Sequence, residues 1–213
     1  MPESMDCQNW EYDNHPDRNA ILPVRCNDWL VALAKGSLNP QILSCDTRPA
    51  HLYLFEDLTP DGCKYLAGHY RGDNYSFLQY YNVRIAGDPR VGVDASVVLS
   101  SMNHLKKTID LGMSAINSAY QAPDDVLPRS EKIIYIVKFA TAVLVEFLRI
   151  HPYANGNGHM ARLIIFTLLF QHKLWPKNWP FDKSPPYHQL ISIYRDGAEK
   201  PLEDFILESV LGV

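Results

Sequence analysis

The sequence predicts a mostly helical protein that carries one small β-hairpin. Apolar residues recur every three or four positions in both halves of the chain, as they do on the buried faces of helices. Two segments, 133–150 and 160–174, are apolar on nearly every side, which is typical of helices at the centre of a bundle. Residues 75–96 are instead rich in Tyr, Val and Ile around a Gly-Asp-Pro turn, which favours a hairpin.

The composition is that of a single globular domain. A chain of 213 residues can bury one self-sufficient core. The formal net charge of -4 offers no basic face to a nucleic acid and no cationic patch to a membrane, so we expect the protein to bind neither. Residues 1–23 are polar and contain Pro and Asn, which predicts a loosely ordered N-terminal arm before one domain over 24–213.

The location is predicted to be cytoplasmic. The first residues lack the basic start and the apolar core of a signal peptide. The apolar stretch 133–150 carries Lys138, Glu146 and Arg149, which favours a buried helix over a membrane span. An effector secreted without a cleavable signal would have the same sequence features.

The four cysteines fit no metal-binding pattern, because they lie far apart in the first third of the chain. Free thiols in a reducing compartment are the favoured interpretation, and a disulfide in an exported protein is the alternative. The four are Cys7, Cys26, Cys45 and Cys63.

The first half of the chain is predicted to contain two helices and the hairpin. Apolar spacing indicates a helix over 24–36, which ends at Gly36, and a short helix near 51–57. The hairpin has one strand over 79–86 and a return over 90–93. Two strands alone are marginal in water, so this hairpin must lie against other elements.

A long helix is predicted to follow, capped by Asp94 or Ser96 and reaching about Ala119. Its apolar residues follow one another at steps of three and four, which marks a single buried stripe. The stripe consists of Val98, Met102, Leu105, Ile109, Met113 and Ile116.

The second half is predicted to hold two central helices and two shorter ones. The first central helix runs over 130–150, and the second begins at Gly158 or His159 after a polar loop. A Pro-rich stretch then interrupts the chain, and helices over 186–195 and 202–211 close it.

The polar loop HPYANGNGHMAR, residues 151–162, has the parts of an anion site. Gly156 and Gly158 allow positive φ and a close approach of the backbone to a ligand. Amides at the start of a helix bind phosphates, and Arg162 can reach back to the same place.

His151 lies at the end of the preceding helix, where its imidazole can take a proton from a hydroxyl. A base, an amide cradle and a cation together favour nucleotidyl or phosphoryl transfer. The alternative is a tight corner between two helices, with Arg162 tied to a carboxylate.

The loop resembles the motif of the Fic family, HPFx(D/E)GNGRxxR, in its His, Pro, aromatic residue, Gly-Asn-Gly and final Arg. The upstream stretch AGHYRG, residues 67–72, and the hairpin after it look like the family's flap and its approach; we expect Arg71 to be an ion-pair partner in the core. The resemblance covers about 24–213 and implies a Fic-type helical bundle with a β-hairpin flap beside the active-site loop.

The resemblance implies a protein adenylyltransferase, which moves AMP from ATP to a Ser, Thr or Tyr hydroxyl of a target protein. Carried over by position, His151 is the general base. The amides of Gly156, Asn157 and Gly158 bind the α- and β-phosphates, and Arg162 holds the outer phosphates.

The family's flap docks the target protein by adding its backbone as a strand. By position, the flap here consists of Tyr81, Asn82, Val83, Arg84 and Ile85. A protein substrate that docks on these residues is therefore the expected partner.

The sequence departs from the family pattern at two positions. Asn155 stands where an acidic residue helps to hold magnesium, so we expect Mg²⁺ to bind, but more weakly. His159 replaces an Arg in the phosphate site, which puts the donor in question. Phosphate, UMP or phosphocholine transfer is therefore an alternative, and so is a degenerate module that binds a nucleotide or a partner without turnover.

Many Fic proteins carry an inhibitory helix, (S/T)xxxE(G/N), whose Glu pairs with the final Arg. SIYRDG, residues 192–197, has this shape with Asp196 in place of Glu. The favoured interpretation is an ordinary helix that ends at Gly197. Regulation by an inhibitory partner protein or by a homo-oligomer stays open.

Overall fold

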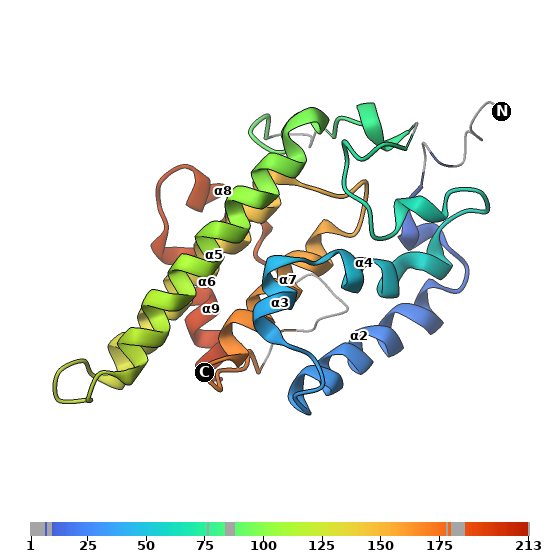
Figure 1. Cartoon of the computed structure of the whole chain (residues 1–213). Coiled ribbons are helices and arrows are strands. Elements are labelled where there is room, and N and C mark those ends of the chain that lie inside the picture. Colours follow the sequence, from blue (N-terminus) through green and yellow to red (C-terminus); the bar gives the residue numbers. More distant parts are fainter. Residues whose placement is uncertain are drawn as a thin grey trace.

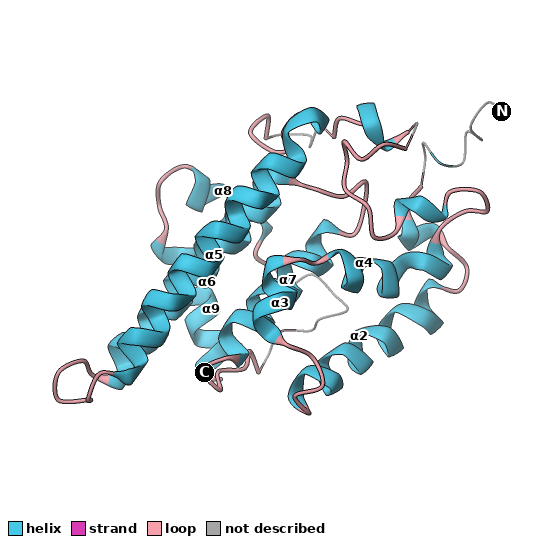
Figure 2. Ribbon diagram, in the orientation of Figure 1, coloured by secondary structure: helices cyan, strands magenta, loops and turns pink. Residues whose placement is uncertain are grey.

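Helices dominate the structure, as the sequence predicts. The computed structural model describes residues 7, 10–75, 77–83, 88–177, 179 and 186–212. No strand occurs among these described residues, and Figure 2 shows helices joined by loops. None of the helices in this part of the chain is both long and apolar enough to cross a membrane.

Three helices form the centre of the molecule. The long helices α5 (Val98–Gln121) and α6 (Arg129–Ile150) run side by side, and α7 (Asn157–Phe170) packs on α6 (Figure 1). Almost every side chain of α7 is buried, because the helix is apolar on all sides and must be surrounded by protein. The predicted stripe of α5, from Val98 to Ile116, is buried without exception.

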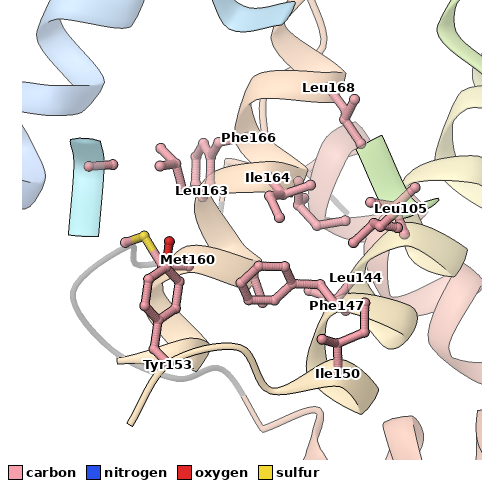
Figure 3. Close-up of a cluster of buried hydrophobic side chains, with 14 of the residues drawn as sticks. Leu105, Leu144, Phe147, Ile150, Tyr153, Met160, Leu163, Ile164, Phe166 and Leu168 are labelled. Carbon is pink, nitrogen blue, oxygen red and sulfur yellow. The ribbon is translucent and has the colours of Figure 1, made fainter. Parts of the chain in front are cut away.

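The core joins α6, α7 and the loop between them. Figure 3 shows Leu144, Phe147 and Ile150 of α6 close to Met160 of α7 and Tyr153 of the loop. All five side chains are buried. The loop is therefore anchored in the core, which fixes the ends of both helices relative to each other.

The N-terminal helices cover α7 from another side. They are α2 (Arg18–Ala34), α3 (Pro40–Cys45) and α4 (Arg48–Phe55). Helix α3 contacts α5 and α7, and α2 packs on α4. Short 3-10 helices connect and flank the main elements: η1 (Tyr12–Asn14), η2 (Glu56–Leu58), η3 (Lys64–Leu66), η4 (Leu78–Tyr80) and η5 (Ala95–Val97).

The last two helices are α8 (His188–Arg195) and α9 (Lys200–Leu211), and α9 packs on α6. Both lie within two residues of their predicted bounds. Gly197 has φ +96°, so it supplies the left-handed stop that the sequence indicates.

The chain before residue 24 is more ordered than the predicted arm. Helix α2 begins at Arg18 and includes Pro23, which the sequence analysis places outside the helix. The pyrrolidine ring removes one helical hydrogen bond there, and the buried side chains of Leu22 and Cys26 hold the helix in place. Trp10 is also buried.

The predicted hairpin is not observed in the described residues. Leu78–Tyr80 form η4, where a strand over 79–86 is expected, and residues 84–87 lie outside the described part of the chain. The segments on either side of residues 84–87, here called the flap legs, still lie close together. A Cβ placed on Gly92 would lie only 2.4 Å from the Val83 carbonyl oxygen. In the described part of these legs, the carbonyls of Tyr81 and Val93 accept hydrogen bonds from the Arg71 side chain in place of a strand partner.

A disulfide joins Cys7 to Cys63, across 56 positions of sequence. The favoured interpretation of four free thiols is therefore wrong for this pair. The sequence misleads because neither residue belongs to a recognisable cysteine spacing. Cys26 and Cys45 take no part in this disulfide.

Candidate active site

His151 ends helix α6 in a strained conformation. Its backbone has φ 54° and ψ 61°, in the left-handed region, while its N–H donates to the Phe147 carbonyl at 2.9 Å. This turn reverses the chain into residues 151–156, here called the motif loop. The ring Nδ1 is buried and has no hydrogen-bond partner among the described residues.

The imidazole of His151 is neutral at physiological pH. Burial lowers its pKa to about 4, and the positive charges of Arg71 and Arg195 act in the same direction. A neutral ring has a free nitrogen lone pair. The side chain is therefore able to accept a proton, although it is a weaker base than an ordinary histidine.

Arg71 holds the His151 backbone in place. Its Nε donates to the His151 carbonyl at 2.8 Å, and Nη2 donates to the Ile150 carbonyl at 3.0 Å. The same guanidinium reaches the Tyr81 carbonyl at 3.0 Å and the Val93 carbonyl at 2.9 Å. It thus satisfies carbonyl groups of both flap legs, which explains why those groups need no strand partner.

The side chain of Arg71 is fully buried and takes no carboxylate partner among the described residues. The expected core ion pair is therefore replaced by four carbonyl oxygens. Burial lowers the pKa of the guanidinium to about 10, which leaves it charged at neutral pH.

Asn157 braces the motif loop from inside. Its Oδ1 accepts from the Tyr153 N–H and its Nδ2 donates to the Tyr153 carbonyl, both at 2.9 Å. Because the amide group is consumed by these two bonds, its side chain does not point at a ligand. Only its backbone N–H stands at the start of α7, where the prediction places a phosphate contact.

Tyr153 anchors the loop in the core, in the position where the family has Phe. Its hydroxyl shares a 2.7 Å hydrogen bond with Thr47 Oγ1. Its ring stacks on His51 with centroids 3.8 Å apart and planes 9° from parallel. The hydroxyl therefore adds a polar tie to α4 that a Phe would lack.

His51 is a loop contact that the sequence analysis missed. Its Nδ1 accepts from the Gly68 N–H at 3.0 Å, so the ring proton lies on Nε2, which donates to the Asn155 carbonyl at 2.9 Å. Burial lowers the pKa of His51 to about 3, which keeps this tautomer neutral. No local sequence pattern marks the residue, because its partners lie far along the chain.

Gly156 is required by space and by backbone conformation. It has φ +76°, and a Cβ at this position would lie 2.5 Å from Phe55 Cε2 and 3.1 Å from His51 Nε2. The loop is therefore pressed against α4 and leaves no room for a larger residue.

Asn155 does not fit the role of a metal ligand. Its Oδ1 already accepts from the Gly156 N–H at 2.8 Å, and its Nδ2 donates to Glu11 and to the Trp10 carbonyl. No cluster of three or more His, Cys, Asp or Glu suited to a metal occurs in the described residues.

The first turn of α7 is the place where the sequence predicts the phosphate contacts. The N–H groups of Asn157 and Gly158 have no intrahelical acceptors at this position. The side chain of Arg162 folds back over the turn. Its Nη1 would lie 3.3 Å from a Cβ placed on Gly158. Both the amides and the cation thus gather at one place, beside the motif loop.

The described contacts of Asp196 agree with an ordinary helix end for α8. Asp196 Oδ1 accepts from Arg90 Nη1 at 2.8 Å, so the acidic side chain pairs with Arg90 and not with Arg162. Asp88 links this pair to Arg195, at 3.2 Å. The segment 192–197 therefore behaves as an ordinary helix end.

The comparison with protein families agrees with this geometry. The model of the Fic/DOC family matches residues 50–169, which is more than half of the chain. The chain belongs to the Fic/DOC family. The matched region runs from α4 through the motif loop to α7, so it contains the groups that form this Fic site.

Curated relatives of this Fic chain match over a shorter stretch. Protein adenylyltransferase Fic of Drosophila virilis is 27% identical over 75 residues, which cover 35% of this chain and 16% of the relative. The protein of the same name from Drosophila melanogaster is also 27% identical over 75 residues, covering 35% of this chain and 15% of the relative. The chain thus spans about a sixth of the length of these relatives.

Proposed function

We propose that this Fic domain transfers AMP from ATP to a Ser, Thr or Tyr hydroxyl of a target protein. The observation that carries the proposal is the position of Arg162, folded over the amides of the first turn of α7 beside the loop of His151. The motif loop thus has a neutral imidazole at its start, and an amide cradle and a cation follow at its end. The printed names of the relatives, protein adenylyltransferases, support the same donor.

The proposed reaction is an in-line displacement at the α-phosphorus. The target oxygen forms a bond to this phosphorus, the bond to the bridging oxygen breaks, and pyrophosphate leaves. His151 takes the proton of the attacking hydroxyl, which its neutral state allows. The amides of Asn157 and Gly158 and the guanidinium of Arg162 stabilise the charge on the phosphates.

Arg71 acts in this proposal as a positioning residue. It joins the carbonyl of His151 to the carbonyls of Tyr81 and Val93, one on each flap leg. The base and the residues proposed to dock the target therefore share one rigid connection. Magnesium would enter with ATP, held by phosphate oxygens and water, since the neutral amide of Asn155 is a poorer ligand than a carboxylate and already bonds to Gly156, Glu11 and Trp10.

A binding module without turnover is the second candidate. It is favoured by the engagement of Asn155 with Glu11 and of His159 with Tyr12, which leaves neither side chain open to a ligand. Transfer of phosphate, UMP or phosphocholine is a third option for the same site.

Labelled donors separate these functions. Wild-type protein is incubated under reducing conditions with a cell lysate and with ATP labelled at the α- or the γ-phosphate, or with labelled UTP or CDP-choline. AMP transfer predicts protein-bound label from α-labelled ATP alone. Label from another donor would reassign the reaction, and ATP binding without any label would favour the binding module.

A further inference from the structure

The first turn of α7 is covered by protein. The side chain of Arg162 is only 1% exposed and that of His159 only 3%, although a triphosphate must reach this turn. Among the described residues, the chain just before α2 contacts this turn. We call residues 10–14 the cover.

Tyr12 is the central contact of the cover. Its hydroxyl lies 3.4 Å from His159 Nδ1, and the two rings meet edge to face with centroids 5.5 Å apart. The same phenol ring packs on Phe55 at 4.8 Å. Burial raises the pKa of Tyr12 to about 12, while the nearby charge of Arg162 opposes this shift. A neutral phenol therefore stands beside the cation that the proposed function assigns to the outer phosphates.

The residues next to Tyr12 hold the cover on the motif loop. Asn155 Nδ2 donates to the Glu11 carboxylate and to the Trp10 carbonyl. The Trp10 indole donates to the Leu58 carbonyl at 2.7 Å, and its side chain is buried. The carboxylate of Glu11 also places a negative charge where anionic phosphates would arrive.

A disulfide fixes the start of this segment. Cys7 stands three positions before Trp10 and is joined to Cys63, just ahead of η3. Both sulfur-bearing side chains are buried. A tethered segment acts at a high effective concentration, so the few contacts of Tyr12 and Glu11 suffice to keep it in place. Without the tether, the same contacts would compete with solvent and with a ligand.

We propose that residues 10–14 form a cover over the phosphate site, latched by the Cys7–Cys63 disulfide, and that reduction of this disulfide opens the site to the nucleotide donor. The consequence for ATP rests on the proposed function, whereas the latch itself does not. Reduction consumes two equivalents of a thiol, such as a glutathione-type thiol, or one dithiol. The S–S bond of the protein breaks, both cysteines gain a proton and an electron, and the reductant leaves as its own disulfide.

The latch is tested by hydrogen exchange of the first turn of α7. Amide exchange of residues 157–160 is followed by mass spectrometry in the oxidised protein, after reduction with dithiothreitol, and in the Cys7→Ser/Cys63→Ser double variant. The double variant matters because the buried disulfide can react slowly with a reductant. Cys45→Ser is the matched control, since Cys45 is a free cysteine away from the cover.

The same proteins are titrated with ATP. The proposal predicts faster exchange of 157–160 and an affinity at least about tenfold higher in the reduced protein and in the double variant, as for a site that is closed in most molecules. Tyr12→Ala should act in the same direction with the disulfide intact. Tyr135→Ala, a half-exposed tyrosine on α6, should leave both readouts unchanged.

Two results would each overturn one proposal, either the cover or the ATP donor. If exchange of 157–160 is the same with the disulfide, without it and in Tyr12→Ala, the cover is overturned, whatever ATP does. If exchange rises as predicted but ATP binds in no state, the cover stands and the proposed donor is wrong.

Discussion

Arg71 Nε donates to the His151 carbonyl oxygen over 2.8 Å, and this bond connects the chain before the flap legs to the residue proposed as the base. The other donors of the guanidinium reach three more carbonyls, so one buried cation joins three backbone segments, around Tyr81, Val93 and 150–151. A planar fork with five N–H groups suits this task, whereas an ammonium group has three donors and no fixed plane.

Arg71→Lys therefore tests the connection. We expect the variant to lose about 2 to 4 kcal/mol of unfolding free energy, because at least one buried carbonyl is left without a donor and the geometry of the others changes. Urea denaturation measures this loss. Arg129→Lys, at an exposed position at the start of α6, is the control and should stay within about 0.5 kcal/mol of wild type. Equal losses of unfolding free energy in both variants would show that the bonds of Arg71 to the backbone carbonyls add no particular stability.

Gly156→Ala tests the contact between the motif loop and α4. The new methyl group would overlap Phe55 and would strain a backbone with φ +76°, so we expect a loss of about 2 to 4 kcal/mol. Gly36 is a matched control, since it has φ +71° and open space around the Cβ position. Gly36→Ala should show only the backbone cost of about 1 kcal/mol. Similar midpoints for the two variants in thermal melts would contradict the close packing of the loop.

Tyr153→Phe tests the polar tie of the loop. The substitution restores the family's usual residue but removes the hydrogen bond to Thr47, so we expect a loss of about 1 to 2 kcal/mol. Adding Thr47→Val should recover only part of this loss, because the Thr47 hydroxyl is no longer left alone but the buried Tyr70 hydroxyl, which bonds to both groups, loses them. A double-mutant cycle with a coupling energy near zero would show that the two hydroxyls do not interact.

Two buried histidines predict acid sensitivity. The pKa values of His51 and His151 are lowered to about 3 and about 4, mainly by burial. Below pH 6.5 the unfolded chain binds protons at these positions and the native state does not, so stability falls as the pH drops. Each histidine contributes about 1.4 kcal/mol per pH unit until its folded pKa is reached.

His151→Asn isolates one of these contributions. Asn tolerates the left-handed backbone of residue 151 and does not titrate. The unfolding free energy of this variant should depend less steeply on pH between 4 and 6.5 than that of wild type, by about one proton per molecule. Parallel pH profiles of the two proteins would show that His151 is not held neutral by the fold.

Much of the fold follows from periodicity alone. The stripe of α5, the two central helices and the last two helices depend on local apolar spacing, which the sequence displays directly. Arg71 and His51 could not be assigned from the sequence, because their partners lie about 80 and 104 positions away. The predicted hairpin is not shown in the described residues, because the carbonyls of Tyr81 and Val93 bond to Arg71 and residues 84–87 lie outside the described part of the chain. No local pattern reveals the bonds to Arg71.

In the motif loop, too, the sequence predicts some features and not others. The turn at Gly156 and the backward reach of Arg162 follow from glycine and helix geometry, and the structure agrees. The closed state of the site was not foreseen, because the sequence of residues 10–14 gives no sign that Tyr12 packs on His159. The composition of the first 23 residues instead predicted disorder.

Transfer of label from α-labelled ATP, compared between wild type and His151→Asn under reducing conditions, tests the central claim most directly. The claim is that α7 and Arg162 bind the donor while His151 removes the proton. It predicts that both proteins bind ATP with similar affinity and that only wild type labels a target. Label at the wild-type rate from His151→Asn would contradict it.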